Sequence, residues 1–119
     1  MECAVSERLR HQDGVELHPK LFNTPLIYGD GPGRRAMEDI YREYMAVAER
    51  AGLPILLTAP TWRLDARRVG ESGVPETINR DAVAFLGEVV KGGRGKALVG
   101  ALTGPKEDCY RPGLSPDAE

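Results

Sequence analysis

Two polar segments, each directly after an apolar run, contain the side chains best suited to ligand binding. Thr58, Thr61 and Trp62 follow the first run, and Thr103 and Asp108 follow the second. Loops after the carboxyl ends of buried parallel strands are where α/β proteins handle ligands. We therefore expect any chemistry of this chain to involve these hydroxyl, indole and carboxylate groups.

Each of these residues also has a simpler structural explanation. The two threonines of the first segment could cap a loop, and Trp62 could pack against the core. Either Asn79 or Thr77 could cap the helical pattern that follows, and Asn79 is expected to be a helix cap before it is a ligand. His18 stands directly before a proline and is expected to be a solvated loop histidine.

The two cysteines do not form a recognisable metal motif. Cys3 and Cys109 lie near opposite ends of the sequence, and neither has a Cys or His at zinc-finger spacing. Because the chain has the features of a cytosolic protein, a disulfide between them is disfavoured. We expect both to be ordinary thiols.

Length and composition restrict the possible classes. The chain has 119 residues, enough for one domain, with 16 basic and 18 acidic residues and a net charge of −2. No basic cluster indicates a nucleic-acid or anionic-membrane partner. No apolar run approaches the ~20 residues of a membrane span, and no secretory signal is visible. We expect a cytoplasmic protein.

The elements expected to position these side chains are two helices and two strands. Apolar residues recur every three or four positions in residues 34–51 and again in residues 79–91, which predicts two amphipathic helices. Continuous apolar runs within residues 53–62 and 96–103 predict strands buried on both faces. This alternation favours an α/β fold with a parallel sheet.

Several motifs together resemble those of the homocysteine S-methyltransferase family, in the order that family has them. The resemblance extends over nearly the whole chain, and the matching segments are residues 2–9, 40–44, 53–63, 78–83, 103–105 and 108–112. It implies a partial (β/α)8 barrel in which residues 1–119 supply about the first three βα units, with parallel strands. The chain would then be the truncated N-terminal portion of that barrel domain.

The resemblance implies zinc-assisted methyl transfer to the thiolate of homocysteine, giving methionine. The methyl donor would be a sulfonium, betaine or folate-type compound, and a zinc ion held by three cysteines would bind the sulfur. The family's zinc cysteines lie in a later region that this sequence lacks, so we expect no zinc to be bound by this chain alone. No catalytic or metal-ligating residue is assigned.

The resemblance also assigns a substrate side. Glu2 matches an acid that accepts a hydrogen bond from the homocysteine amine, although Cys3 replaces the glycine that usually follows it. Trp62 offers an aromatic face suited to a sulfonium or quaternary ammonium. The other expected substrate-binding residues are Thr58, Thr61, Thr103 and Asp108.

Three functions remain open at this point. The chain could contribute to a homocysteine S-methyltransferase-like enzyme whose catalysis needs further residues. It could be a non-catalytic, truncated or split-gene product that self-associates or pairs with a companion chain, because strands with open edges invite pairing. It could also be a small α/β ligand-binding domain unrelated to the family.

Overall fold

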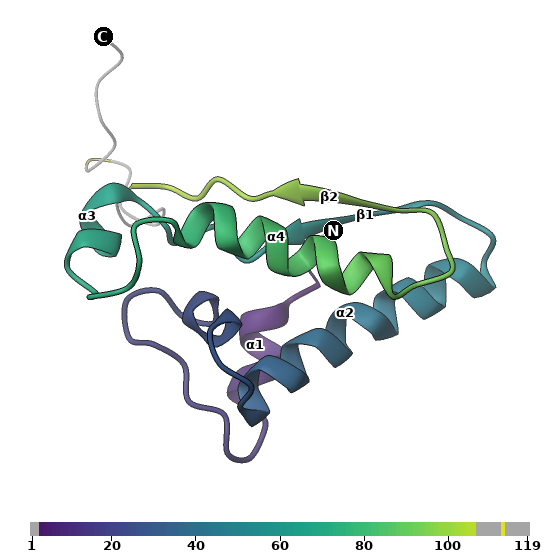
Figure 1. Cartoon of the computed structure of the whole chain (residues 1–119), viewed down its shortest axis with the longest axis horizontal. Helices are drawn as coiled ribbons and strands as arrows, with labels where there is room; N and C mark the ends of the chain where they lie inside the picture. Colours follow the sequence, from purple (N-terminus) through teal and green to yellow (C-terminus); the bar gives the residue numbers. More distant parts are fainter. Residues whose placement is uncertain (1–2, 107–112, 114–119) are drawn as a thin grey trace, which may run out of the picture.

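The computed structural model describes residues 3–106 and 113. Its elements form one βαβ unit preceded by helices (Figure 1). In chain order they are α1 (Val5–Arg10), the 3-10 helix η1 (Thr24–Ile27), α2 (Pro32–Arg50), β1 (Ile55–Ala59), α3 (Ala66–Gly70), α4 (Ile78–Lys91) and β2 (Ala97–Ala101).

The two strands pair in parallel. The register runs from Ile55 opposite Ala97 to Ala59 opposite Ala101. Parallel neighbours need a crossover connection, which α3 and α4 provide here. The expected strands are therefore present, and their carboxyl ends lie at the same edge of the sheet. The expectation that both of their faces are buried is wrong, because Leu56 and Leu98 are exposed on one face.

The expectation of a partial barrel with three βα units is wrong. Within residues 3–106 the sheet has two strands, and no third strand precedes β1. The reason lies at the start of the described chain, where Cys3 and Ala4 have left-handed backbones with φ of 64° and 46°. That conformation is incompatible with an extended strand, and α1 begins at the next residue.

The two long helices follow the predicted pattern closely. Pro32 occupies the first turn of α2, where its missing N–H costs nothing, so the helix begins two residues earlier than expected. It ends before Gly52, whose φ of +66° breaks the helical path. The pattern of α4 predicts a buried face of six residues, of which five are buried and Val90 is half-buried; the buried ones are Ile78, Ala82, Phe85, Leu86 and Val89.

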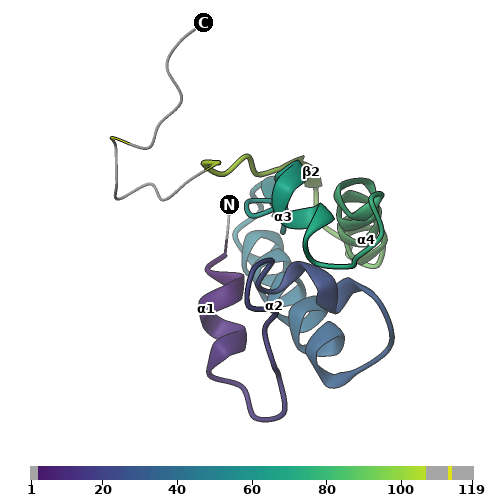
Figure 2. The same cartoon turned by 90° about the vertical axis from the view of Figure 1, so that its left-hand side faces the viewer.

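The helices cover only one face of the sheet. Helix α4 contacts both strands and α2 contacts β1 (Figure 1), while α1 packs beside α2 (Figure 2). Leu57 and Ala59 point into this layer and are buried. Leu56 and Leu98 are opposite each other on the other face, where 50% and 65% of their surfaces are exposed.

No helix in the described part of the chain has both the length and the apolar character needed to span a membrane.

Candidate functional site

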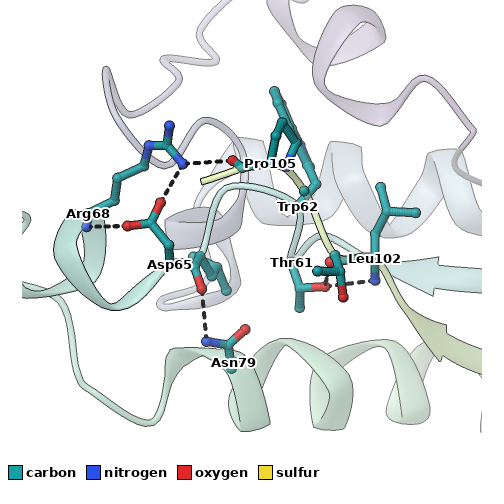
Figure 3. A pocket seen from close by; sticks show the side chains of 10 residues that line it. Thr61, Trp62, Asp65, Arg68, Asn79, Leu102 and Pro105 are labelled. Atoms are coloured by element: carbon teal, nitrogen blue, oxygen red, sulfur yellow. Dashed lines mark hydrogen bonds and ion pairs between the residues drawn. The ribbon is translucent and has the colours of Figure 1, made fainter. Parts of the chain in front are cut away.

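A pocket of about 180 Å³ lies at the carboxyl ends of the two strands. Figure 3 shows that its walls come from the loop after β1, from α3, from the start of α4 and from the loop after β2. Typical ligand pockets measure about 300–1,000 Å³. The volume therefore suits a molecule of amino-acid size or one part of a larger ligand.

Thr61 joins the two loops that form the pocket. Its hydroxyl donates to the carbonyl of Leu102 at 2.7 Å and accepts from the N–H of Leu102 at 2.9 Å (Figure 3). The side chain is buried, so both bonds are shielded from water. Thr61 thus continues the pairing between the strands beyond β1, and its hydroxyl is already used within the protein.

Gly104 brings the second loop against the first. A Cβ atom at this position would lie 1.8 Å from the carbonyl oxygen of Trp62, a distance that no side chain tolerates. Glycine is therefore required for the close approach of the two backbones. Between them, Gly104 and Thr61 set the width of the pocket next to Trp62.

The wall beside α3 carries an ion pair. Asp65 caps α3 by accepting the N–H of Arg68 at 3.0 Å, and its carboxylate also accepts from the guanidinium of Arg68. Burial acts to raise the pKa of Asp65, but the N–H and the guanidinium of Arg68 outweigh it and lower that pKa. The pocket therefore presents a stable negative and a stable positive group side by side.

Arg68 and Asn79 also contact backbone carbonyls in the pocket wall. The guanidinium of Arg68 donates to the carbonyl of Pro105 at 3.4 Å, and the amide of Asn79 donates to that of Leu64 at 3.4 Å (Figure 3). Both distances are long for a hydrogen bond. Because such bonds are weak, both side chains can exchange them for contacts with a ligand.

Asn79 does not cap α4. Thr77 occupies the cap position, and Asn79 lies within the first turn. The helix therefore begins one residue before Asn79, which frees the amide to point toward the loop after β1. Of the two caps that the sequence allows, Thr77 is the one present, and Asn79 belongs to the pocket instead.

The structure brings together three of the residues predicted from the sequence. Thr61, Trp62 and Thr103 line the same pocket, although they come from loops about forty residues apart. Thr58 does not line it and instead borders a separate recess of about 10 Å³, which has room for about one water molecule. Glu2 and Asp108 lie outside the described residues.

Sequence reasoning missed the polar wall formed by Asp65, Arg68 and Asn79. A signal for Asp65 was present, since an aspartate directly before a helical turn is a common N-cap. For Asn79 the helix-cap interpretation masked the alternative. Nothing in the local pattern indicates Phe22, whose ring packs against Trp62 from a distant loop.

The zinc site implied by the resemblance does not fit the described residues. Among them, no three His, Cys, Asp or Glu side chains come close enough together to hold a metal ion. Cys3 is buried at the start of α1, and Cys109 lies outside the described residues. We therefore assign no residue here to a metal.

The family models, the curated proteins and the solved structures contain no match to this chain. The resemblance to homocysteine S-methyltransferases stays a prediction from the sequence motifs.

Proposed function

We propose that the chain binds a small amino-acid-like ligand in the pocket at the carboxyl ends of β1 and β2. Following the sequence resemblance, that ligand is homocysteine or the methyl donor that methylates it to methionine. The supporting observation is the convergence of Thr61, Trp62 and Thr103 on one pocket from two strand ends. The proposal retains the expectation of a cytoplasmic location.

The charges of the pocket support a zwitterionic ligand. Asp65 and Arg68 place a carboxylate and a guanidinium on one wall, and a free amino acid carries both complementary groups. Both side chains are largely withdrawn from solvent, with 22% and 11% of their surfaces exposed. Contacts with them are therefore weakly screened by salt.

The remaining walls support a ligand with a polarisable or cationic sulfur. The indole of Trp62 suits a thioether, a sulfonium or a quaternary ammonium group. Thr103 is exposed at the pocket mouth and can donate or accept a hydrogen bond. The proposed contribution of this chain is to bind and orient, and no step of it depends on a metal.

Calorimetric titration of the purified chain tests this proposal. The probes are L-homocysteine, glycine betaine and S-methylmethionine, each tested separately. We expect at least one to bind, and Thr103→Val to weaken its binding by about 5-fold because one hydrogen bond is lost. Thr58→Val is the matched control, since it makes the same substitution near the end of the neighbouring strand β1 but outside the pocket.

If none of the three probes binds to the wild-type chain, the proposed ligand class is wrong. Equal loss of affinity in both threonine variants would also contradict the proposal, because it would place binding elsewhere. Circular dichroism of both variants confirms that each retains the helices of the parent chain.

The uncovered face of the sheet favours a second function, that of a non-catalytic protein that associates with a companion chain or with itself. Leu56 and Leu98 form an exposed apolar pair on that face. Contiguous exposed apolar groups of this kind mark interaction surfaces. Sedimentation over a range of protein concentrations tests it, and a monomer at every concentration excludes self-association.

A further inference from the structure

Trp62 belongs to a compact cluster with Phe22 and Arg63. The centroids of the two aromatic rings lie 5.1 Å apart at a tilt of 51°. The guanidinium of Arg63 lies 5.2 Å from the Trp62 ring and 5.3 Å from the Phe22 ring. A cation that contacts two rings at these distances is held by both, which couples the two side chains.

Phe22 takes part in this cluster with an unusual backbone. Its φ of 54° is in the left-handed region, which is rare for a bulky aromatic residue. Such a conformation is strained and persists only where the surroundings impose it. The surroundings therefore fix the position of the Phe22 ring.

Hydrogen bonds impose this conformation from both sides. His18 and Phe22 exchange two backbone bonds, each 2.9 Å long. The Nδ1 atom of His18 also accepts from the N–H groups of Lys20 and Leu21, at 3.2 Å and 3.1 Å. His18 thus closes the turn that carries Phe22, a role different from the solvated loop histidine expected from the sequence.

The turn is attached to the same loop that carries Trp62. The hydroxyl of Thr24 donates to the carbonyl of Pro60 at 2.5 Å, and Thr24 has no exposed surface. Leu21 and Asn23, on either side of Phe22, are buried as well. Phe22 and Trp62 are therefore held on two segments whose relative position is fixed.

We propose that Phe22 is a positioning residue that, together with Arg63, holds the indole of Trp62 in place as a wall of the pocket. This inference rests on the proposed ligand-binding function. Arg63 occupies the position that a ligand cation would take on its face of the indole. A bound ligand consequently meets the remaining surface of Trp62, whose orientation Phe22 sets.

The fluorescence of Trp62 provides a direct test, because it is the only tryptophan of the 119-residue chain. The experiment compares Phe22→Leu, which removes the ring, with Phe22→Tyr, which keeps it. We expect Phe22→Leu to increase acrylamide quenching of Trp62 about 2-fold and to weaken binding of the titrated probe by about 2- to 10-fold. Phe22→Tyr should match the wild type in both measurements.

Arg63→Met is the second variant and removes the cation while keeping an apolar stem. It should increase the quenching of Trp62 as Phe22→Leu does, and it decides the question if Phe22→Leu does not fold. If Trp62 is quenched equally in the wild type, in Phe22→Leu and in Arg63→Met, the positioning role is wrong. Failure of the wild type to bind any probe would instead overturn the proposed function, while the quenching comparison still decides how Trp62 is held.

Discussion

At the scale of single residues, the close approach of the Gly104 and Trp62 backbones constrains the shape of the pocket more than any polar side chain does. The backbone of Gly104 passes so close to the carbonyl of Trp62 that a Cβ atom would lie 1.8 Å from its oxygen. The obstacle is backbone rather than a flexible side chain, so it cannot move aside cheaply. One of the two loops must shift if this glycine is replaced.

Gly104→Ala should therefore open the pocket and destabilise the chain. We expect a loss of about 1–3 kcal/mol in the free energy of unfolding, as for other overpacked sites. Denaturant unfolding followed by the fluorescence of Trp62 measures this loss of stability. Gly87→Ala is the control, because a Cβ at Gly87 meets nothing within 4 Å and should stabilise α4 by about 0.5–1 kcal/mol. Similar stability of the two variants would contradict the close approach.

Single residues of the pocket could be predicted only where they follow a strand. Thr61, Trp62 and Thr103 were predicted because an apolar run followed by polar residues identifies a strand end. Asp65 and Asn79 were not, because they reach the pocket through the packing of α3 and α4 against the loops. Such packing is a property of the folded chain and has no local pattern.

At the scale of elements, the start of α4 is tied to η1 through one carboxylate. Asp81 accepts from the hydroxyl of Thr77 at 2.6 Å and from that of Tyr28 at 2.9 Å. Burial, followed by the contact with Asp81, raises the pKa of Tyr28 to about 12. The neutral phenol is therefore favoured in the folded state, and its deprotonation breaks the link between the two elements.

This link predicts a loss of stability at alkaline pH. The contribution of Tyr28 is complete below the ordinary pKa of about 10 and disappears as the pH rises toward 12. Tyr28→Phe should remove that part of the dependence and should lower the stability at neutral pH by less than about 1 kcal/mol, because the lost hydrogen bond is exposed to solvent. Chemical unfolding at several pH values measures it. An unchanged alkaline slope in Tyr28→Phe would show that another group is responsible.

The elements themselves differ in how far periodicity predicts them. The bounds predicted for the two long helices and the two strands agree with the structure to within three residues, because their apolar patterns are strong. The strand that the resemblance requires near the N-terminus is absent from residues 3–31, where left-handed residues and α1 occupy the position. A family resemblance describes which residues match, whereas backbone conformation depends on what this chain can pair with.

At the scale of the whole molecule, the sheet has one layer of helices and an open edge. The N–H of Ile55 donates to the carbonyl of Lys96 at 2.9 Å, which fixes the direction of the ladder. In a parallel pair with this register, the backbone groups of Ala97, Val99 and Ala101 point away from β1. No other strand of the described chain pairs with β2, so these groups are available to a second molecule.

The composition of β2 suits pairing with its own copy. An antiparallel arrangement centred on Val99 would place Ala97 opposite Ala101 of the second molecule, with no charges facing each other. It would also extend the apolar face that includes Leu56 and Leu98. A two-fold arrangement of this kind closes on itself and gives a dimer rather than a filament.

Val99→Pro should abolish this association while leaving the pairing between β1 and β2 intact, because the lost N–H points away from β1 and proline is tolerated on edge strands. Val99→Ala keeps the N–H and is the matched control for the loss of side-chain packing. We expect the sedimentation coefficients of the wild type and of Val99→Ala to rise with concentration, and that of Val99→Pro to stay at the monomer value. Association of Val99→Pro equal to that of Val99→Ala would exclude the edge of β2 as the interface and leave the face formed by Leu56 and Leu98 as the surface through which copies meet.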